Sequence, residues 1–412
     1  MPVTKETLES RADNDKRLST VERLLTAKRV RNYCLLLIGI NALMLVVGFV
    51  RYKSVTLSKA PFGGDFVEFH TAGRILNEYG ARRLYDFQLQ ENLLHEYVPD
   101  FSLPFVTPPY VAILFAPLAH LPVRAAYFVW ILISLALYLL SIQLMLRLEH
   151  LPRHMTFLVC LAFPPFLMLV LVGGQISALG CLILASWLYL MKTRREFAAG
   201  IVLGLLLYKP TLAVFLIPAL LFGRKVRTLI GFGLVAGLLT GLSIWMLGLD
   251  GLVRYIAVLR EFNSLVGQGF APPTMYVDVA TFVRQLFHVD IRYLTILLAL
   301  PLTYLSRHNP ERAIVPTMVL NSYAPVYDLI LLVPVLILAY RFISHRSLAL
   351  LFVFSFFTVP ICQLTGLQVI TPVLLLLCYE LCIKPAIQLN SMTTSSTPLH
   401  HRIVGRGATT LP

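Results

Sequence analysis

Long apolar segments recur along this chain, and the short connections between them alternate between basic and nearly uncharged. The basic connections are 147–154, 192–196, 223–227, 307–312 and 341–346. The connections that alternate with them carry almost no charge, and they are 173–175, 208–210, 322–327 and 362–368. Lysine and arginine in short loops stay on the cytoplasmic side of a membrane. The alternation therefore predicts a protein that crosses the bilayer many times.

The composition supports this class. Hydrophobic residues make up 57% of the 412 positions and charged residues only 14%, whereas soluble domains are about one quarter charged. The net charge of +14 is explained by the basic cytoplasmic loops, so we do not expect a nucleic-acid partner. The six cysteines all fall within apolar segments. We interpret them as small hydrophobic residues, and no disulfide framework is expected.

The loop charges predict an all-α integral membrane bundle of about 12 spans with both termini in the cytoplasm. A polar stretch, residues 1–32, precedes the first apolar run, Tyr33–Val50. In a cleavable signal the apolar core follows directly after a short basic region, so we expect this run to be retained. The predicted organisation is a cytoplasmic basic tail at 1–32, a membrane domain at 33–383 and a second cytoplasmic tail at 384–412.

Two apolar segments conflict with a simple count of spans. Phe197–Phe222 and Arg312–Arg341 each have the length of a single span, yet basic connections flank both of them on both sides. Two hairpins of short helices, turning at Tyr208–Pro210 and at Ser322–Asp328, would keep the basic connections on one side. Interrupted helices are tolerated only against protein or a watery cavity. We favour hairpins that line an outward-facing cavity, with two single spans as the alternative.

The stretch 51–123 is the predicted first outer loop and contains two interfacial helices. Residues 66–80 are expected to form an amphipathic helix. Its apolar residues at helical spacing are Phe66, Phe69, Ile75, Leu76 and Tyr79. Residues 107–122 are too short to cross, so we expect a helix lying flat in the outer interface. Thr107 is its predicted N-cap and Pro108 its first helical residue.

Charged residues concentrate in GGDFVEFH, residues 63–70. One interpretation is structural: Asp65 caps a helix and Glu68, three residues later, completes a capping box. The other is chemical, because a helix N-terminus favours an ionised carboxylate that can accept a proton. The two interpretations are compatible. His70 is off the Asp65 face of an ideal helix, so we do not pair them. Glu68 and His70 are candidates for an auxiliary role at the site.

Six short motifs occur in an order that resembles a known family. They are GGDF (63–66), LYD (84–86), TPPYVAILFAPLAHLP (107–122), FPPFLMLVLVGGQIS (163–177), AAGIVLGLLLYKP (198–210) and YDLILL (327–332). Between about Tyr33 and about Tyr379 the chain resembles glycosyltransferase family 87, the polyprenyl-phosphate-mannose-dependent mannosyltransferases of the GT-C superfamily. One departure is Phe105-Val106-Thr107, where the family usually has an aromatic residue before the double proline.

The resemblance implies a GT-C-type, multi-pass enzyme of the bacterial plasma membrane with its active site on the extracytoplasmic face. The donor would be a polyprenyl-phosphate sugar, with mannose the expected hexose. The acceptor would be a glycolipid or a lipid-anchored glycan. Asp65 matches the residue that serves as general base or orients the acceptor hydroxyl, in an inverting single displacement. No cofactor is implied, and no metal-ligand cluster of the DxD kind is evident.

A leaving phosphate requires cations. Lys209 is the lone charge of a long apolar segment, and a lysine at bilayer depth costs about 2.5–3.5 kcal/mol on insertion scales. It is therefore the main candidate to bind the donor phosphate, and the alternative is a lysine that snorkels to the interface. Arg254 and Arg260 in the predicted second outer loop, 248–275, and Arg284 are weaker candidates. Each of these arginines is better explained as a solvated loop charge or a headgroup contact.

Three further polar residues are candidates for binding the sugar or assisting the reaction. Gln175 follows two glycines at the top of a span, where it would bind sugar hydroxyls or satisfy loop backbone. Tyr327 and Asp328 begin a descending helix. Asp328 would be either an N-cap or an auxiliary residue on the opposite wall of the sugar site.

Two other classes of function remain open from the sequence. A polyprenyl-linked glycan flippase or a secondary transporter would move its substrate without changing it, and a membrane scaffold would have no reaction at all. Transporters commonly show internal repeats and ionisable groups near the bilayer midplane. No convincing repeat is found, and the acids crowd the first outer loop. That placement favours an enzyme, embedded among membrane lipids, that acts at the outer surface.

Overall fold

The computed structural model describes residues 26–51, 63–97, 103–267, 275–321 and 323–387. Within these ranges every named element is a helix, and one isolated antiparallel bridge joins Tyr276 to Pro325. The long helices are α3 (Ala27–Arg51), α7 (Val123–Met145), α12 (Val226–Gly267) and α17 (His345–Thr365). Among the described residues, these four helices are long and apolar enough to cross a membrane. The number rises to five if the bent pair Arg153–Leu161 and Pro165–Leu171 is one span.

The remaining helices are short. At one end of the bundle lie α4 (Phe66–Glu78), η1 (Ala81–Arg83), α5 (Phe87–His95), α6 (Pro109–Phe115) and η2 (Leu118–His120). The bundle further contains α8 (Arg153–Leu161), η3 (Pro165–Leu171), α9 (Ser177–Lys192), α10 (Glu196–Gly204), η4 (Leu205–Tyr208), η5 (Pro210–Leu212) and α11 (Leu216–Phe222). Its C-terminal half adds α13 (Val279–Phe287), α14 (Arg292–Leu305), η7 (Pro310–Ala313), α15 (Ile314–Leu320), η8 (Val326–Leu332), α16 (Val333–Leu338), η9 (Tyr340–Phe342), α18 (Thr371–Cys378) and η10 (Tyr379–Ile383). The number of about 12 membrane spans expected from the sequence stays a prediction.

The segment 196–225 folds back on itself. Helix α10 runs into η4, the chain breaks at Lys209, and η5 and α11 follow. Glu196 Oε1 lies 2.8 Å from Lys225 Nζ, so the two ends of the segment meet. The break lies where the sequence placed it.

The second interrupted segment, 312–342, behaves in the same way. Helices α15 and α16 lie on either side of the break, and the guanidinium of Arg312 lies 5.6 Å from the centre of the Phe342 ring. The tips of the two folded-back segments contact each other, because Asn321 Nδ2 donates to the carbonyl oxygen of Thr211 at 3.0 Å. We call these two segments the first and second hairpins.

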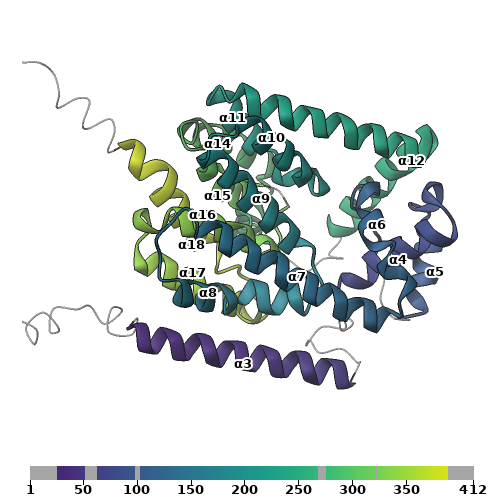
Figure 1. The fold of residues 1–412 in the computed structure, drawn as a ribbon, viewed down its shortest axis with the longest axis horizontal. Coiled ribbons are helices and arrows are strands. Elements are labelled where there is room, and N and C mark those ends of the chain that lie inside the picture. The colour runs from purple at the N-terminus through teal and green to yellow at the C-terminus, as the bar shows by residue number, and fades with distance from the viewer. Residues whose placement is uncertain (1–25, 52–62, 98–102, 268–274, 322, 388–412) are drawn as a thin grey trace, which may run out of the picture.

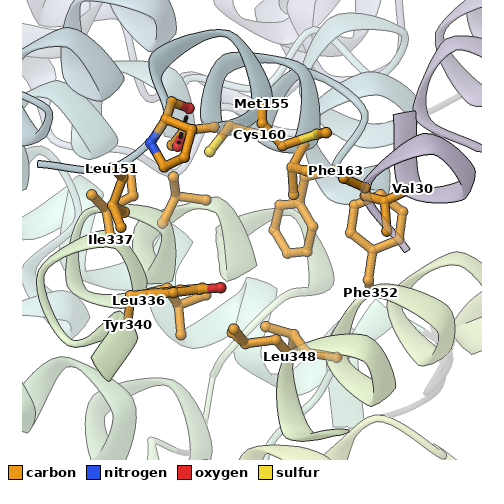
Figure 2. Close-up of a pocket in the computed structure, with 16 residues that line it drawn as sticks. Val30, Leu151, Met155, Cys160, Phe163, Leu336, Ile337, Tyr340, Leu348 and Phe352 are labelled. Carbon is orange, nitrogen blue, oxygen red and sulfur yellow. Dashed lines mark hydrogen bonds between the residues drawn. The ribbon is translucent and has the colours of Figure 1, made fainter. Parts of the chain in front are cut away.

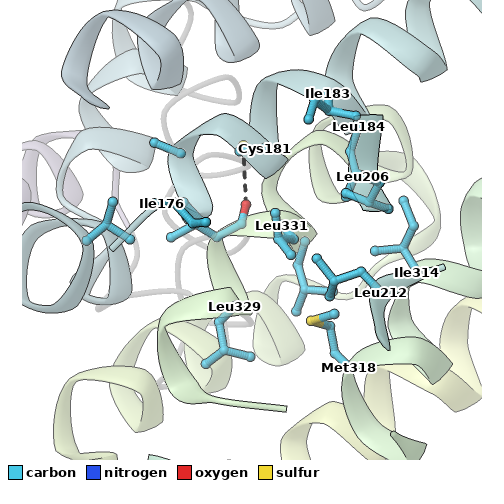
Figure 3. Close-up of a cluster of buried hydrophobic side chains, with 14 of the residues drawn as sticks. Ile176, Cys181, Ile183, Leu184, Leu206, Leu212, Ile314, Met318, Leu329 and Leu331 are labelled. Atoms are coloured by element: carbon cyan, nitrogen blue, oxygen red, sulfur yellow. Dashed lines mark hydrogen bonds between the residues drawn. The ribbon is translucent and has the colours of Figure 1, made fainter. Parts of the chain in front are cut away.

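A shared apolar cluster holds helix α9 against both hairpins (Figure 3). Ile176 and Leu184 come from the α9 region, Leu206 and Leu212 from the first hairpin, and Met318 and Leu331 from the second. All of these side chains are buried. Burial of a leucine- or isoleucine-sized side chain contributes about 1.5–3 kcal/mol, so this cluster fixes the hairpin tips relative to α9.

The basic connections gather at one end of the bundle. Lys192 Nζ lies 2.7 Å from Glu311 Oε1, which joins the connection 192–196 to 307–312. Leu151 and Tyr340 line one hollow together with Ala27 at the start of α3. Helices α4, α5 and α6 lie at the opposite end (Figure 1). The alternation of charge along the sequence therefore corresponds to two ends of the folded molecule.

The predicted outer loop 248–275 contains a helix that was not expected, because α12 continues beyond a kink to Gly267. The helix kinks at Gly248, which has φ 67° and ψ 176°. Glycine adopts such a conformation without steric cost, so one residue redirects the helix where a loop was expected. Figure 1 shows the second part of α12 near α6.

The first outer region contains the predicted helices with two corrections. Phe66, Phe69 and Ile75 of α4 are buried as expected, but Tyr79 at its C-cap is 47% exposed. Helix α6 begins at Pro109 with Pro108 in the cap position, so Thr107 is not the N-cap. The first proline fits the extended cap conformation and the second fits the first helical turn.

Candidate active site

A cavity of about 440 Å³ opens between α4, the segment before α6, the second part of α12 and the tips of the hairpins. Its walls are mainly apolar and aromatic, with few ionisable groups. The ionisable side chains among its lining are Asp65, Glu68, Lys209, Tyr208, Tyr255, Tyr323 and Tyr327. A mostly apolar cavity with a few converging polar groups is the usual form of a small-molecule or cofactor site.

A tight turn brings Asp65 to this cavity. Gly63 and Gly64 have φ of 94° and 44°, and a Cβ at Gly64 would lie 2.6 Å from the carbonyl oxygen of Gly173. The Asp65 backbone N–H donates to that same oxygen at 3.0 Å. The turn therefore needs glycine both for its conformation and for the close approach of the loop that contains Gln175.

The carboxylate of Asp65 does not cap α4, so the predicted capping box with Glu68 is wrong. Asp65 occupies the N-cap position without a side-chain cap hydrogen bond. A capping residue has an extended backbone, whereas Asp65 is helical, with φ −71° and ψ −13°. Its Oδ2 instead accepts a hydrogen bond from Gln175 Nε2. Gln175, a candidate sugar ligand from the sequence, is thus also the residue that holds Asp65.

Burial dominates the electrostatics of Asp65. It raises the pKa of this carboxyl to about 6, while the hydrogen bond from Gln175 and the positive charge of Lys209 act to lower it. The helix N-terminus was expected to keep the group ionised, but burial outweighs that influence. A carboxylate with a pKa near 6 is still mostly ionised at pH 7 and is well matched to accept a proton.

Glu68 lines the same cavity, one helical turn after Asp65. Burial, and then the charge of Asp65, raise the pKa of Glu68 well above its ordinary value. The neutral form of Glu68 is therefore favoured beside an ionised Asp65. His70 is buried but does not line the cavity, and its Nε2 lies 3.1 Å from the carbonyl oxygen of Leu121. As expected, it does not pair with Asp65.

Lys209 reaches the cavity from the tip of the first hairpin and is not a solitary charge. Its ammonium forms an ion pair with Asp328 of the second hairpin. It also lies 4.8 Å from the ring centre of Tyr327 and 5.4 Å from that of Tyr323. An ammonium has three N–H donors, and part of the Lys209 side chain, 16%, stays exposed.

Asp328 is neither the predicted N-cap nor a wall of the cavity. Pro325 precedes η8 in the cap position. The Asp328 side chain is 1% exposed, and its Oδ1 accepts a hydrogen bond from Ser177 Oγ at 2.7 Å. Asp328 therefore links Lys209 to Ser177 of α9 outside the lining of the cavity. Its neighbour Tyr327 does line the cavity.

The three candidate arginines are not brought to this site. Arg254 and Arg260 are exposed, Arg284 is half-buried, and none of them lines the cavity. Arg254 and Arg260 point away from the cavity because the chain after Gly248 is an unexpected helix that presents other residues to it. Its cavity-lining residues are Tyr255, Leu259 and Phe262. Their spacing of four and three residues is helical, and this is the signal in the sequence that would have found them.

Two of the sequence motifs meet next to the cavity. Tyr85 of the LYD motif donates from its hydroxyl to the carbonyl oxygen of Thr107 at 2.6 Å. Asp86 of the same motif accepts from the backbone N–H of Leu89 at 3.2 Å and so caps α5. Because Thr107 lines the cavity, the LYD motif supports the wall of the site without entering it.

The fold and the cavity define a helical membrane protein with a mainly apolar cavity, lined also by Asp65 and Lys209, at one end of its bundle. The model of glycosyltransferase family 87 matches residues 105–362, and the chain belongs to that family. Asp65 precedes the matched segment, which contains Gln175, Lys209 and Asp328.

A curated relative is similar to part of the chain. The chain is 30% identical over 221 residues to an alpha-(1->3)-arabinofuranosyltransferase of Mycolicibacterium smegmatis. The match covers 48% of this chain and 50% of the relative, so the chain spans about half the length of that protein. No solved structure matches.

Proposed function

We propose that the protein transfers a sugar from a polyprenyl-phosphate donor to a glycolipid or lipid-anchored glycan acceptor, with Asp65 as the general base. The single observation that carries the proposal is that Asp65 and Lys209 line one cavity while each is held by a different partner. A proton acceptor and a phosphate-binding cation are the two groups that such a transfer requires.

The proposed reaction is an inverting single displacement. The acceptor hydroxyl oxygen attacks the anomeric carbon and forms the new C–O bond, while its proton passes to the carboxylate of Asp65. The bond between the anomeric carbon and the phosphate oxygen breaks, and the lipid phosphate leaves with the electron pair. Lys209 would stabilise that developing charge as a compact point charge. A positioned base typically contributes about 10²–10⁴-fold.

Both substrates have an apolar part, and the cavity is suited to them. Its lining combines tyrosines with Leu103, Val106 and Leu259. Aromatic rings offer apolar faces to a sugar or a prenyl chain and a polar hydroxyl at the edge. The cavity lies at the end of the bundle away from the basic connections. Since those connections belong in the cytoplasm, we place the active site on the extracytoplasmic face of the bacterial plasma membrane.

The donor sugar has two candidates. The resemblance to polyprenyl-phosphate-mannose enzymes favours a hexose, mannose first. The name of the curated relative, an arabinofuranosyltransferase, favours a pentofuranose in a similar site. Both sugars would use the same base and the same leaving group, so the assignment of Asp65 and Lys209 does not depend on which is correct.

The test is a transfer assay with purified protein in detergent. The donors are polyprenyl-phosphate mannose, polyprenyl-phosphate arabinofuranose and a nucleotide-linked hexose, and the acceptor is an envelope glycolipid extract. We expect product from one of the lipid-linked donors only, with the anomeric configuration inverted and with activity retained in EDTA. Transfer from the nucleotide sugar would overturn the donor assignment. Absence of turnover, together with transbilayer movement of the lipid-linked sugar, would favour the flippase alternative.

A further inference from the structure

A second hollow lies at the end of the bundle opposite to the proposed active site. It has a volume of about 380 Å³ and opens between α3, α8, α16 and α17 (Figure 2). Its walls are almost wholly apolar. In Figure 2, Val30 of α3, Met155 and Phe163 near α8, and Leu336 and Phe352 surround one open space. We call this hollow the apolar slot.

A polar hollow adjoins the apolar slot. It has a volume of about 570 Å³ and is formed by residues 146–153. The two hollows share Leu151 and Pro152 in their linings, so they are adjacent at that point. The charged side chains of the polar hollow are Arg147, Arg153 and Glu149. Two arginines against one glutamate make it positive, and both arginines are exposed.

The surroundings extend this positive charge. Helix α3 contributes Val30 to the slot, and Lys28 and Arg31 are exposed near its start. Helix α17 contributes Leu348 to the slot, and Arg346 is exposed on its first turn. Several helices thus present an apolar residue to the slot and a cation close to it in sequence. The arrangement is amphipathic, with an apolar interior and exposed cations beside it.

From this arrangement we infer a binding site for an anionic phospholipid of the surrounding bilayer. One acyl chain would occupy the apolar slot, and the phosphate would lie in the polar hollow near Arg147 and Arg153. An apolar slot alone would accept an acyl chain of any lipid. The arginines make the site selective, because basic pockets between membrane helices on the cytoplasmic side favour acidic headgroups, and an arginine binds phosphate through two parallel hydrogen bonds.

The bound lipid would join α3 to the rest of the molecule. Helix α3 is mostly exposed, and Ala27 and Val30 at its start line the slot. A lipid held between α3 and helices α8 and α17 binds the folded protein and not the unfolded chain, so it stabilises the fold by mass action. This inference concerns a different end of the molecule and does not rest on the proposed transferase mechanism.

The test measures the melting temperature of delipidated, full-length protein in neutral detergent. Phosphatidylglycerol and phosphatidylcholine with identical acyl chains are titrated separately. For the wild type we expect the half-saturating concentration of phosphatidylglycerol to be at least about 5-fold lower, since one arginine near a membrane surface contributes about that factor. The double variant Arg147→Gln/Arg153→Gln should lose this preference but still respond to both lipids.

Two further variants make the result specific. Arg195→Gln/Arg227→Gln removes two exposed arginines from other basic connections, and it should keep the preference. Val159→Phe fills the slot and should weaken stabilisation by both lipids. Equal affinity for the two lipids in the wild type would overturn the inference. So would a preference that survives in the Arg147/Arg153 variant, or unchanged lipid binding in Val159→Phe.

Discussion

Asp65 and Asp328 are two aspartates that distant parts of the chain hold in place, yet the groups that hold them differ in charge. Asp65 is held by the neutral amide of Gln175 and lines the cavity. Asp328 is held by the ammonium of Lys209 and the hydroxyl of Ser177, and it is shut away from the cavity. A neutral partner leaves a carboxylate able to take up a proton, whereas an ion-paired carboxylate serves to position its cation. The comparison supports the proposed role of Asp65 as the base and a supporting role for Asp328.

The largest effect is expected for Asp65→Asn. The asparagine can still accept from Gln175, and it removes a carboxylate that is unfavourably buried, so folding should be preserved. Transfer should fall by at least about 10²-fold, because the proton acceptor is lost. The measurement is sugar transfer per folded protein, with the melting temperature as the control. Near-normal transfer would move the base elsewhere and would leave Glu68 as the other carboxyl in the described lining of the cavity.

Asp328→Asn should differ from Asp65→Asn in that its main effect is a large loss of stability. Removing one partner of a buried ion pair leaves the other charge uncompensated and costs about 3 kcal/mol. The melting temperature in detergent should fall. The KM for the donor should rise less than in Lys209→Met, because the ammonium is still present but is no longer held by Asp328. The double variant Lys209→Met/Asp328→Asn should regain most of the stability. If Asp328→Asn were as stable as the wild type, the supporting role of Asp328 would have to be abandoned.

Lys209→Met should affect the kinetics of the donor and not those of the acceptor. We expect the donor kcat/KM to fall about 10-fold or more, with the KM for the acceptor little changed, because the ammonium acts on the phosphate alone. The double variant with Asp328→Asn should show the same donor defect without the buried unpaired carboxylate. Lys225→Met, which breaks the ion pair with Glu196 at the other end, is the matched control. Unaltered donor kinetics would reduce Lys209 to a structural lysine.

Gln175→Met tests how Asp65 is held through the pH dependence of transfer. The wild-type rate should rise with pH through about 6, where Asp65 loses its proton. Since the hydrogen bond from Gln175 lowers the pKa of Asp65, its removal should raise that pKa. The acidic limb should therefore move to higher pH, by about one unit. A lower rate with an unshifted limb would mean that Gln175 binds the sugar and does not tune the base.

Glu68→Gln should have the smallest effect. Burial and the charge of Asp65 already favour the neutral form of Glu68, and glutamine is a neutral side chain of the same shape. We expect transfer within about 3-fold of the wild type across pH 6–8, a modest change on the scale of general-base effects. A loss as large as that of Asp65→Asn would show that Glu68 acts as a carboxylate and that the two acids work as a pair.

Local features of the sequence predicted local features of the structure. Basic and neutral connections lie at opposite ends of the bundle, and the chain breaks at Lys209 and again between α15 and η8. These features depend on hydrophobic length and charge, which are readable within a single segment. Two local predictions of backbone conformation failed next to glycine residues. Gly64 places Asp65 in a turn that cannot cap, and Gly248 lets α12 continue through a stretch predicted as a loop.

By itself the sequence determined the class of the protein, a helical membrane protein, and the residue types available for its chemistry. Only the tertiary structure decided which charges meet. Gln175 and Asp65 are 110 residues apart, Lys209 and Asp328 are 119 apart, and Ser177 and Asp328 are 151 apart. No periodicity spans such separations, because these pairs form only once α9 and the two hairpins bury a common apolar cluster. Packing therefore separated a carboxylate that can accept a proton from one that supports a lysine.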